Sequence, residues 1–244
     1  MKINKDITIG SIVAEDIRVA SIFQKYGLDF CCGGNKTLQV ACLAQDIDIE
    51  SIISELNEVN KIEGEKIDYQ SLELDELVTY IIQTHHRYIN EKGPITAQFI
   101  EKVAHVHGER HHETVEIARI FKELLSELGP HMMKEEKVLF PYIMNLVKIE
   151  KGEISSNSFR QFVSNPIRVM MMEHDKAGDM LKSIKKISNN YSVPVDACNT
   201  YKAAFSNLQE MSDDIILHIH LENNILFPKA VKLEENLTRD ILEK

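Results

Sequence analysis

The segment His218–Pro228, which reads HIHLENNILFP, decides the fold predicted for this chain. An earlier segment, His131–Pro141, reads HMMKEEKVLFP and repeats its pattern of His, Glu four residues later and a closing Leu-Phe-Pro. The two copies are 87 residues apart. On a helix, residues i and i+4 lie one turn apart on the same face, so each copy directs an imidazole and a carboxylate to one side. Two such helices facing each other in a bundle would form a site for a pair of metal ions.

The amino-acid composition favours an all-helical protein with a proper hydrophobic core. Of 244 residues, 43% are hydrophobic and 27% are charged, whereas aromatic residues make up only 7% and Trp is absent. Ile, Leu, Glu and Lys dominate and Pro is scarce, which favours helices. The net charge of −10 and the lack of a visible Lys/Arg cluster argue against nucleic acid as a partner.

Two further features of the sequence bear on cellular location. The N-terminus lacks an apolar signal core, and no apolar run approaches the length that spans a bilayer. Two of the four cysteines are adjacent, which is not the pattern of a secreted disulfide framework. We therefore expect a cytoplasmic protein with no membrane partner.

Residues 1–62 are predicted to form a small helical domain that contains cysteine. Apolar residues recur with a helical period in three runs, at 8–26, 38–43 and 49–59. We expect Gly27 to end the first run and Thr37 to cap the second. Between these two residues lies the sequence DFCCGGNK at 29–36, a turn that holds the two adjacent cysteines.

Longer amphipathic patterns predict an up-and-down four-helix bundle over residues 72–236. Residues 63–71 are expected to link it to the N-terminal domain, and residues 237–244 to form a C-terminal tail. We expect the first bundle helix to end at Gly93–Pro94, because proline cannot donate a backbone hydrogen bond. For the same reason, Pro130 should kink or restart the second helix immediately before the first His/Glu segment.

Two further histidines extend the repeat from the twin segments to whole helices. His86 precedes His131 by 45 residues. In the same way, His174 precedes His218 by 44 residues, so each half of the bundle supplies one single His and one His/Glu pair. The neighbouring His85 competes with His86, because helical periodicity places His85 nearer the centre of the apolar face. The 45-residue spacing favours His86.

Four imidazoles and two carboxylates suit a pair of transition-metal ions, because imidazole suits iron, zinc and copper and a carboxylate can bridge two metals. A single His-x-x-x-Glu pair is more often an ordinary ion pair on a helix surface. Two copies in matching context, each followed by Leu-Phe-Pro, make metal binding the better interpretation. Ferritin-like di-iron bundles use Glu-x-x-His and more carboxylates. The excess of His here resembles a hemerythrin-like four-helix bundle instead.

The sequence departs from oxygen-carrying hemerythrins at one position. Their third helix offers His-x-x-x-His, whereas here His174 is followed four residues later by Gly178. One metal thereby lacks an imidazole and has more room for an exogenous ligand. This difference favours a reactive centre over a reversible oxygen carrier.

Three motifs in combination resemble the iron-sulfur cluster repair di-iron protein family. They are the twin segments, EHDKAG at 173–178 and DFCCGGNKTL at 29–38. The resemblance covers nearly the whole chain and implies a small cysteine-bearing N-terminal domain joined to a hemerythrin-like bundle. It also implies two non-haem iron ions per chain, joined by oxo and carboxylate bridges. The implied iron ligands, with both glutamates bridging, are His86, His131, Glu135, His174, His218 and Glu222.

The family's role is to restore iron-sulfur clusters damaged by nitrosative or oxidative stress, and we expect this chain to do so by donating iron. Its partners would be damaged iron-sulfur proteins, with nitric oxide or oxygen species as small ligands, and the resemblance suggests a homodimer. Two alternatives stay open. The same irons could reduce nitric oxide to nitrous oxide, or the chain could be an iron store or a gas or redox sensor. Whether it is an enzyme is therefore open as well.

The adjacent cysteines Cys31 and Cys32 have two interpretations. They are either small buried residues in a turn or a redox or iron-transfer site, because thiolates are soft iron ligands. The resemblance favours the second interpretation. It also matches His107, which we expect to contact the iron ligands or to line a channel to them. Structural roles are expected for Cys42 and Cys198, and solvated or structural roles for His105, His111, His112 and His220.

Overall fold

In a computed structural model of the chain, described for residues 3–59, 68–155 and 163–242, every regular element is a helix. An isolated bridge between Thr8 and Thr37 is the only strand-like pairing in these ranges. The predicted all-α fold is therefore confirmed. The chain divides into two compact units. The first comprises Met1–Val78, Ile143–Val163 and Ile219–Lys244, and the second comprises Thr79–Tyr142 and Ser164–His218.

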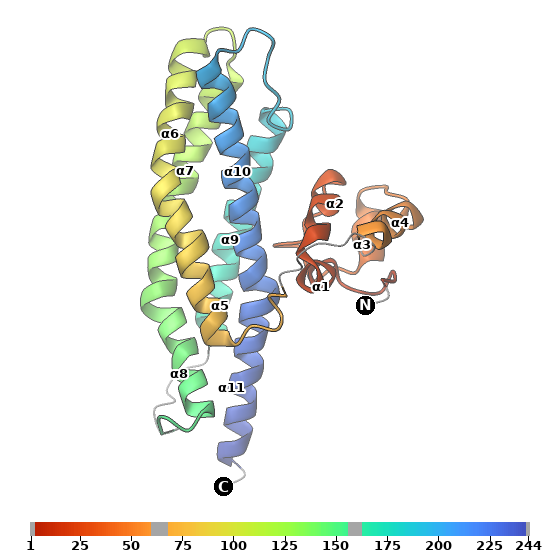
Figure 1. Cartoon of the computed structure of the whole chain (residues 1–244), viewed down its shortest axis with the longest axis vertical. Helices are drawn as coiled ribbons and strands as arrows, with labels where there is room; N and C mark the ends of the chain where they lie inside the picture. The colour runs from red at the N-terminus through yellow and green to blue at the C-terminus, as the bar shows by residue number, and fades with distance from the viewer. Residues whose placement is uncertain (1–2, 60–67, 156–162, 243–244) are drawn as a thin grey trace. The chain divides into compact units, whose positions relative to one another are not determined.

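The second unit is an antiparallel four-helix bundle, which Figure 1 draws from yellow through green and cyan to blue. Its helices are η2 (Ile82–His86) with α6 (Arg87–His107), α7 (Glu113–Lys134) with η3 (Glu135–Leu139), α9 (Ser164–Ile187) and α10 (Asn199–Leu221). α6 packs on α7, and α7 packs on α9. Successive helices run in opposite directions (Figure 1), so the predicted up-and-down bundle is confirmed.

The first bundle helix continues through Pro94, where we predicted its end. Ile89 before the proline and Ile100 after it are both buried, so one apolar face persists along the helix. Gly93 approaches α7 so closely that a Cβ atom there would lie 2.9 Å from Leu125 Cδ2. A proline inside a helix costs about 3 kcal/mol. Packing against α7 on both sides of Pro94 outweighs that cost.

The second bundle helix also contains its proline as an internal residue. α7 runs unbroken through Pro130 to Lys134, so the predicted restart before His131 is wrong. Leu128 and Met132, on either side of the proline, are buried and hold this part of α7 in the bundle interior. Tertiary packing again overrides the local preference of proline.

Three helical segments have π-helical geometry, namely η2, η3 and η5 (Glu222–Leu226). In η3 the N–H of Phe140 bonds to the carbonyl of Glu135, five residues earlier. The N–H of Phe227 bonds to the carbonyl of Glu222 in the same way. Such segments are rare and are frequently found at functional sites. The twin segments therefore share backbone geometry as well as sequence.

The first unit contains the short N-terminal helices together with later segments of the chain. Its elements are α1 (Ile9–Glu15), η1 (Ile17–Val19), α2 (Ala20–Lys25), α3 (Leu38–Ala44), α4 (Ile49–Val59), most of α5 (Leu74–Ile81), most of α8 (Phe140–Glu150), η5 and α11 (Phe227–Leu242). The side chain of Thr37 accepts a hydrogen bond from the N–H of Val40 and caps α3, as predicted. Gly27 follows α2 in the left-handed conformation, with φ of 68°, which is the predicted stop.

The predicted domain boundaries at residues 62, 72 and 236 stay predictions. Residues 63–67 of the predicted linker lie outside the described residues. α11 continues to Leu242, so the predicted tail is helical up to that residue. Within the described ranges, no helix is both long and apolar enough to cross a membrane.

Candidate metal centre

Five of the six predicted metal ligands lie in the second unit and are at most 3% exposed. They are His86 at the end of η2, His131 in α7, Glu135 at the start of η3, His174 in α9 and His218 in α10. Each bundle helix therefore contributes at least one. Burying so many polar groups costs free energy unless they are paired or bind a metal.

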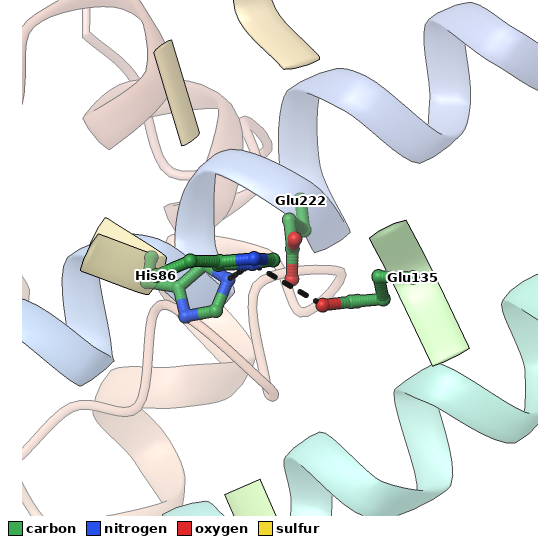
Figure 2. A group of neighbouring side chains, drawn as sticks. His86, Glu135 and Glu222 are labelled. Atoms are coloured by element: carbon green, nitrogen blue, oxygen red, sulfur yellow. Dashed lines mark hydrogen bonds and ion pairs between the residues drawn. The ribbon is translucent and has the colours of Figure 1, made fainter. Parts of the chain in front are cut away.

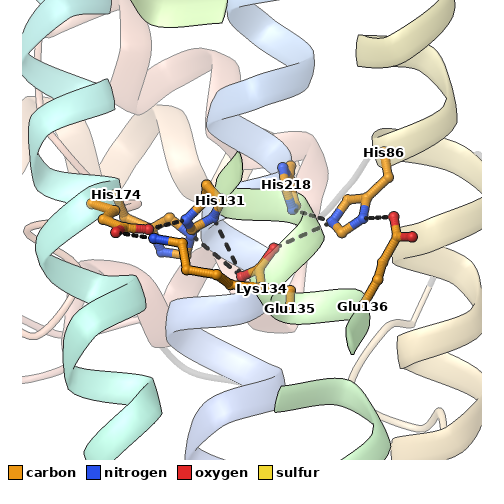
Figure 3. Close-up of polar contacts among 8 residues, drawn as sticks. His86, His131, Lys134, Glu135, Glu136, His174 and His218 are labelled. Atoms are coloured by element: carbon orange, nitrogen blue, oxygen red, sulfur yellow. Dashed lines mark hydrogen bonds and ion pairs between the residues drawn. The ribbon is translucent and has the colours of Figure 1, made fainter. Parts of the chain in front are cut away.

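The carboxylate of Glu135 lies between two sets of imidazoles (Figure 3). Its Oε2 atom is 3.4 Å from Nε2 of His86, a contact that Figure 2 shows in close-up. Its Oε1 atom is 3.3 Å from Nε2 of His131 and 3.9 Å from Nε2 of His174. A carboxylate with one oxygen on each side has the arrangement of a ligand that bridges two metal ions.

The four imidazoles form two close pairs through their Nε2 atoms. Nε2 of His86 lies 3.2 Å from Nε2 of His218. Nε2 of His131 lies 3.0 Å from Nε2 of His174. Each pair shares Glu135, and within each set the ligand atoms lie within 4.8 Å of one another.

The outer ring nitrogens of two of these histidines contact carboxylates at the edge of the bundle (Figure 3). Nδ1 of His86 lies 2.8 Å from Glu136 Oε1, and Nδ1 of His131 lies 2.8 Å from Glu173 Oε2. Burial raises the pKa of Glu173, but its bonds to Lys134 and His131 outweigh this and hold the pKa below its ordinary value. An ionised carboxylate accepts a hydrogen bond from Nδ1–H, which leaves the Nε2 lone pair facing the centre.

This tautomer makes the centre fit a pair of cations. Nitrogen lone pairs that face one another at hydrogen-bond distance repel unless a proton or a metal ion lies between them. Imidazole nitrogens and carboxylate oxygens are ligands that iron, zinc and copper accept. The carboxylates outside the imidazoles match the support that metal-binding histidines usually have in proteins.

The contested position at the end of η2 has a clear geometry. His86 directs Nε2 toward Glu135 and His218, whereas Nδ1 of His85 lies 2.9 Å from Asp214 Oδ1. The His85 ring stacks on that of His218 at 5.7 Å, with an interplanar angle of 5°. The geometry therefore favours His86 as the ligand and gives His85 a supporting position beside His218.

The sixth predicted ligand, Glu222, is the first residue of η5 in the first unit. Its side chain is fully buried. The helix is continuous from α10 into η5, so Glu222 follows His218 by about one helical turn. Its place in the second twin segment is the same as that of Glu135 in the first.

The predicted cysteine site lies in the first unit, in the turn before α3. Asp29 holds this turn, because its Oδ1 atom accepts from the N–H of Cys32 at 3.0 Å and lies 3.3 Å from Cys31 Sγ. A bond to Cys32 and burial raise the pKa of the Cys31 thiol well above its ordinary value. Cys32 is half-buried. These three side chains place ligand atoms within 4.8 Å of one another, as a cation site would.

Two asparagines that follow Glu222 hold the cysteine turn. Asn224 Nδ2 donates to two carbonyls of the turn, each at 3.2 Å, and Asn223 Nδ2 donates to the Cys31 carbonyl at 3.3 Å. A Cβ atom added at Gly10 or at Gly34 would lie 2.3 Å from Asn224 Oδ1. The amide of Asn224 therefore fits between two glycines.

Two other histidines, His220 and His107, can be compared with what the sequence predicted. His220 is fully buried, and burial lowers its pKa to about 4, so the solvated alternative is wrong and the structural one holds. Its ring meets that of Phe30 edge-on at 5.4 Å. His107 is separated from His86 by the 21 residues of α6, or about 30 Å at 1.5 Å per residue. The predicted contact of His107 with the ligands is therefore wrong.

Sequence patterns missed the carboxylates that support the histidines. Glu136 directly follows Glu135, and Glu173 directly precedes His174, so both stand beside predicted ligands. The only available signal was this adjacency. The π-helical segments were also missed, because a period of 3.6 residues was assumed throughout.

Comparisons with known proteins agree with this geometry. A family model described as a domain of unknown function, DUF542, matches residues 5–60. A second model, the hemerythrin HHE cation binding domain, matches residues 77–230.

Curated relatives match nearly the whole chain. The iron-sulfur cluster repair protein YtfE of Enterobacter sp. is 36% identical over 227 residues, which cover 93% of this chain and 97% of the relative. A probable iron-sulfur cluster repair protein of Haemophilus influenzae is 38% identical over 212 residues, covering 86% of this chain and 90% of the relative. YtfE of Citrobacter koseri is 37% identical, with coverage of 93% and 97%.

Proposed function

The chain belongs to the family of iron-sulfur cluster repair proteins, and from this premise we propose that it repairs damaged iron-sulfur clusters by supplying iron from a di-iron centre. One observation carries the proposal. The buried carboxylate of Glu135 faces one pair of imidazoles with each oxygen. The name of the matched bundle model, a cation binding domain, supports a metal at that position.

In this proposal His86 and His218 hold one iron, and His131 and His174 hold the other. Glu135 would contribute one carboxylate oxygen to each side of the centre. Glu222 is proposed as a second bridge, because it is buried and follows His218 by one turn in the same continuous helix. The bound irons would supply the ferrous ion that a damaged cluster has lost.

The surrounding residues keep the ligands in position. Glu136 and Glu173 accept hydrogen bonds from the Nδ1–H groups of their histidines, which fixes the ring tautomer and directs each Nε2 lone pair inward. Lys134 bonds to Glu173 and keeps that carboxylate ionised. Imidazoles outnumber carboxylates among the proposed ligands, and imidazole is a ligand that suits iron.

We also propose that Cys31 and Cys32 form the transfer site, which receives iron or meets the damaged cluster. Their sulfur atoms lie 3.7 Å apart, and Asp29 adds a carboxylate oxygen. Soft thiolate ligands suit ferrous iron. The half-buried Cys32 is the more accessible of the two.

The proposal is tested by following iron from this protein to a damaged client. The protein, purified after anaerobic expression, should contain about two irons, with the Mössbauer signature of a coupled pair, as expected of a shared carboxylate bridge. Incubation with a dehydratase whose cluster has lost iron should restore dehydratase activity while this chain loses a matching amount of iron. Sustained nitrous oxide production from nitric oxide and a reductant, with no iron loss, would contradict donation.

Two neighbouring histidines provide a matched pair of variants. His86→Ala should remove about one iron per chain, because Nε2 of His86 faces Glu135 and His218. His85→Ala should retain both irons, because its Nδ1 contacts Asp214 instead. Iron content per folded chain, with folding checked by circular dichroism, measures the difference. The opposite ranking would overturn the assignment of His86.

A further inference from the structure

A thiol–imidazole pair lies at the end of α6 far from the metal ligands. Nε2 of His107 is 3.3 Å from Sγ of Cys198, within hydrogen-bond distance for sulfur. His107 is only 8% exposed, whereas Cys198 is exposed and free. We predicted a structural role for Cys198, but an exposed thiol beside a buried imidazole has the environment of a reactive cysteine.

Cys198 also stands at the N-terminus of a long helix. Its carbonyl accepts from the N–H of Lys202 at 3.1 Å, so it occupies the capping position of α10. The backbone N–H of Tyr201 lowers the pKa of the Cys198 thiol, and that of Thr200 adds to this effect. The positive end of the helix dipole stabilises a thiolate at such a position.

Two buried polar atoms beside this pair have no hydrogen-bond partner among the described residues. They are Nδ1 of His107 and the hydroxyl of Tyr201, a side chain that is 1% exposed. The rings of the two residues meet edge-on at 5.4 Å. Tyr201 also lines a pocket of about 400 Å³ whose walls are mixed, with polar Ser188 and Ser192 beside apolar Val193 and Phe205. An unsatisfied buried hydroxyl on a residue that lines such a pocket fits a ligand that has hydrogen-bonding groups as well as an apolar part.

We propose that Cys198 is a reactive thiol that undergoes exchange with small polar disulfides of the glutathione type. The thiolate attacks one sulfur of the disulfide, forming a mixed disulfide with Cys198 and breaking the original S–S bond. The second sulfur leaves as a thiolate and takes a proton from solvent. His107 donates its Nε2–H to the Cys198 sulfur and orients it, and the pocket beside Tyr201 receives the polar part of the bound thiol.

The other cysteines are less suited to this reaction. Cys31 is buried, and both its bond to Cys32 and its burial raise its pKa. Cys42 is buried as well, and burial raises its pKa. Cys32 is half-buried, and its sulfur lies 3.7 Å from that of Cys31, whereas Cys198 is exposed. Selectivity for Cys198 is therefore expected.

The test is the reaction of the full-length, iron-loaded protein with oxidised glutathione, followed by intact mass and peptide mapping. The first mixed disulfide should form on Cys198, and Cys198→Ser should abolish it. Each unit by which the thiol pKa falls raises the thiolate fraction about tenfold and lowers nucleophilicity about threefold, so the net gain near neutral pH is about threefold. The same cysteine in the chain unfolded in urea gives the reference rate and pH midpoint.

His107→Gln should slow the modification and move the midpoint of its pH profile toward that of the unfolded chain. His111→Gln is the matched control, because Nε2 of His111 bonds to Asp196 at 3.1 Å and not to sulfur. His111→Gln should leave unchanged both the rate of Cys198 modification and the midpoint of its pH profile. Circular dichroism and iron content confirm that both variants fold. First modification at another cysteine, or equal Cys198 rates in the folded and unfolded chains, would overturn the proposal.

Discussion

The two His/Glu segments share one backbone geometry, but the residue after the shared glutamate has a different task in each. In the first copy this residue is Glu136, whose carboxylate contacts the outer nitrogen of His86. In the second copy it is Asn223, which donates to the Cys31 carbonyl. Both copies have π-helical geometry that begins at the glutamate.

The difference shows how a repeated segment can keep the same His and Glu while the residues next to them differ in identity and in their contacts. The residues that are the same in both copies, the His and the Glu, are the proposed metal ligands. Residues on the other faces are free to change partners. One copy thus supports an imidazole, and the other holds the turn that carries the proposed transfer site.

The largest expected effect is at the shared glutamates. Glu135→Ala should remove nearly all iron, because its carboxylate faces both imidazole pairs. Glu222→Ala should have a similar effect if both copies bridge. Glu234→Ala is the control, since Glu234 is also buried but bonds to the N–H of Val163. Iron per chain by elemental analysis is the measurement. Full iron occupancy in Glu222→Ala would show that the glutamates of the two copies have different roles.

The next largest effect is on the pH dependence of stability. It concerns the residue two positions after the His of each copy. The first copy has the exposed Met133 there, and the second has the buried His220, whose pKa is lowered to about 4. The folded state therefore binds fewer protons than the unfolded state. Stability from His220 is full above pH about 6.5 and falls as pH decreases toward 4, by at most about 1.4 kcal/mol per unit.

His220→Met, which copies Met133, should make unfolding less dependent on pH in this range. Urea unfolding of the metal-free wild type and variant between pH 7 and 4.5 gives the difference, in which the contributions of the other histidines cancel. Parallel pH profiles would show that His220 is not held neutral by burial.

A smaller effect is expected when the residue after the glutamate is exchanged. Glu136→Asn copies the second segment into the first and removes the carboxylate from Nδ1 of His86. Iron affinity should fall about 10- to 100-fold, as is typical for loss of such a supporting group. Asn223→Ala should leave iron affinity unchanged. Competition with a ferrous chelator measures both, and equal affinities would show that the Glu136 contact does not support the ligand.

The smallest effect should follow from Asn224→Ala, which removes two hydrogen bonds to the cysteine turn. A loss of about 1–2 kcal/mol in the free energy of unfolding is expected. Iron content should stay the same, while Cys32 should alkylate faster. Lys137 occupies the corresponding position of the first copy and is exposed, so Lys137→Ala should change neither property. An unchanged alkylation rate in Asn224→Ala would show that the turn does not depend on it.

Much of the fold followed from apolar periodicity, because long amphipathic helices leave a strong pattern. α4 matches its predicted run, and Thr37 and Gly27 end their elements as local chemistry requires. Pro94 and Pro130 did not end their helices, because the effect of a proline depends on how well the flanking turns pack. No local rule contains that information.

A second limit of prediction from apolar periodicity concerns the neighbouring residues His85 and His86 at the candidate site. Periodicity favoured His85, whereas His86 is the residue that faces Glu135. Both lie in the π-helical segment η2, which holds more residues per turn than an α-helix. A period of 3.6 residues therefore does not identify which of the two side chains faces Glu135. The repeat spacing gave the better answer, since it compares whole helices and not angles within one turn.

The contact between Asn224 and two glycines makes the local packing of three distant positions interdependent. A side chain at Gly10 or Gly34 would collide with the Asn224 amide, and a shorter residue at 224 would leave the carbonyls of the cysteine turn without that donor. None of the three can change alone without loss. A chimera that takes its first 60 residues from a relative should therefore be most stable when it keeps Gly at positions 10 and 34 together with Asn at position 224.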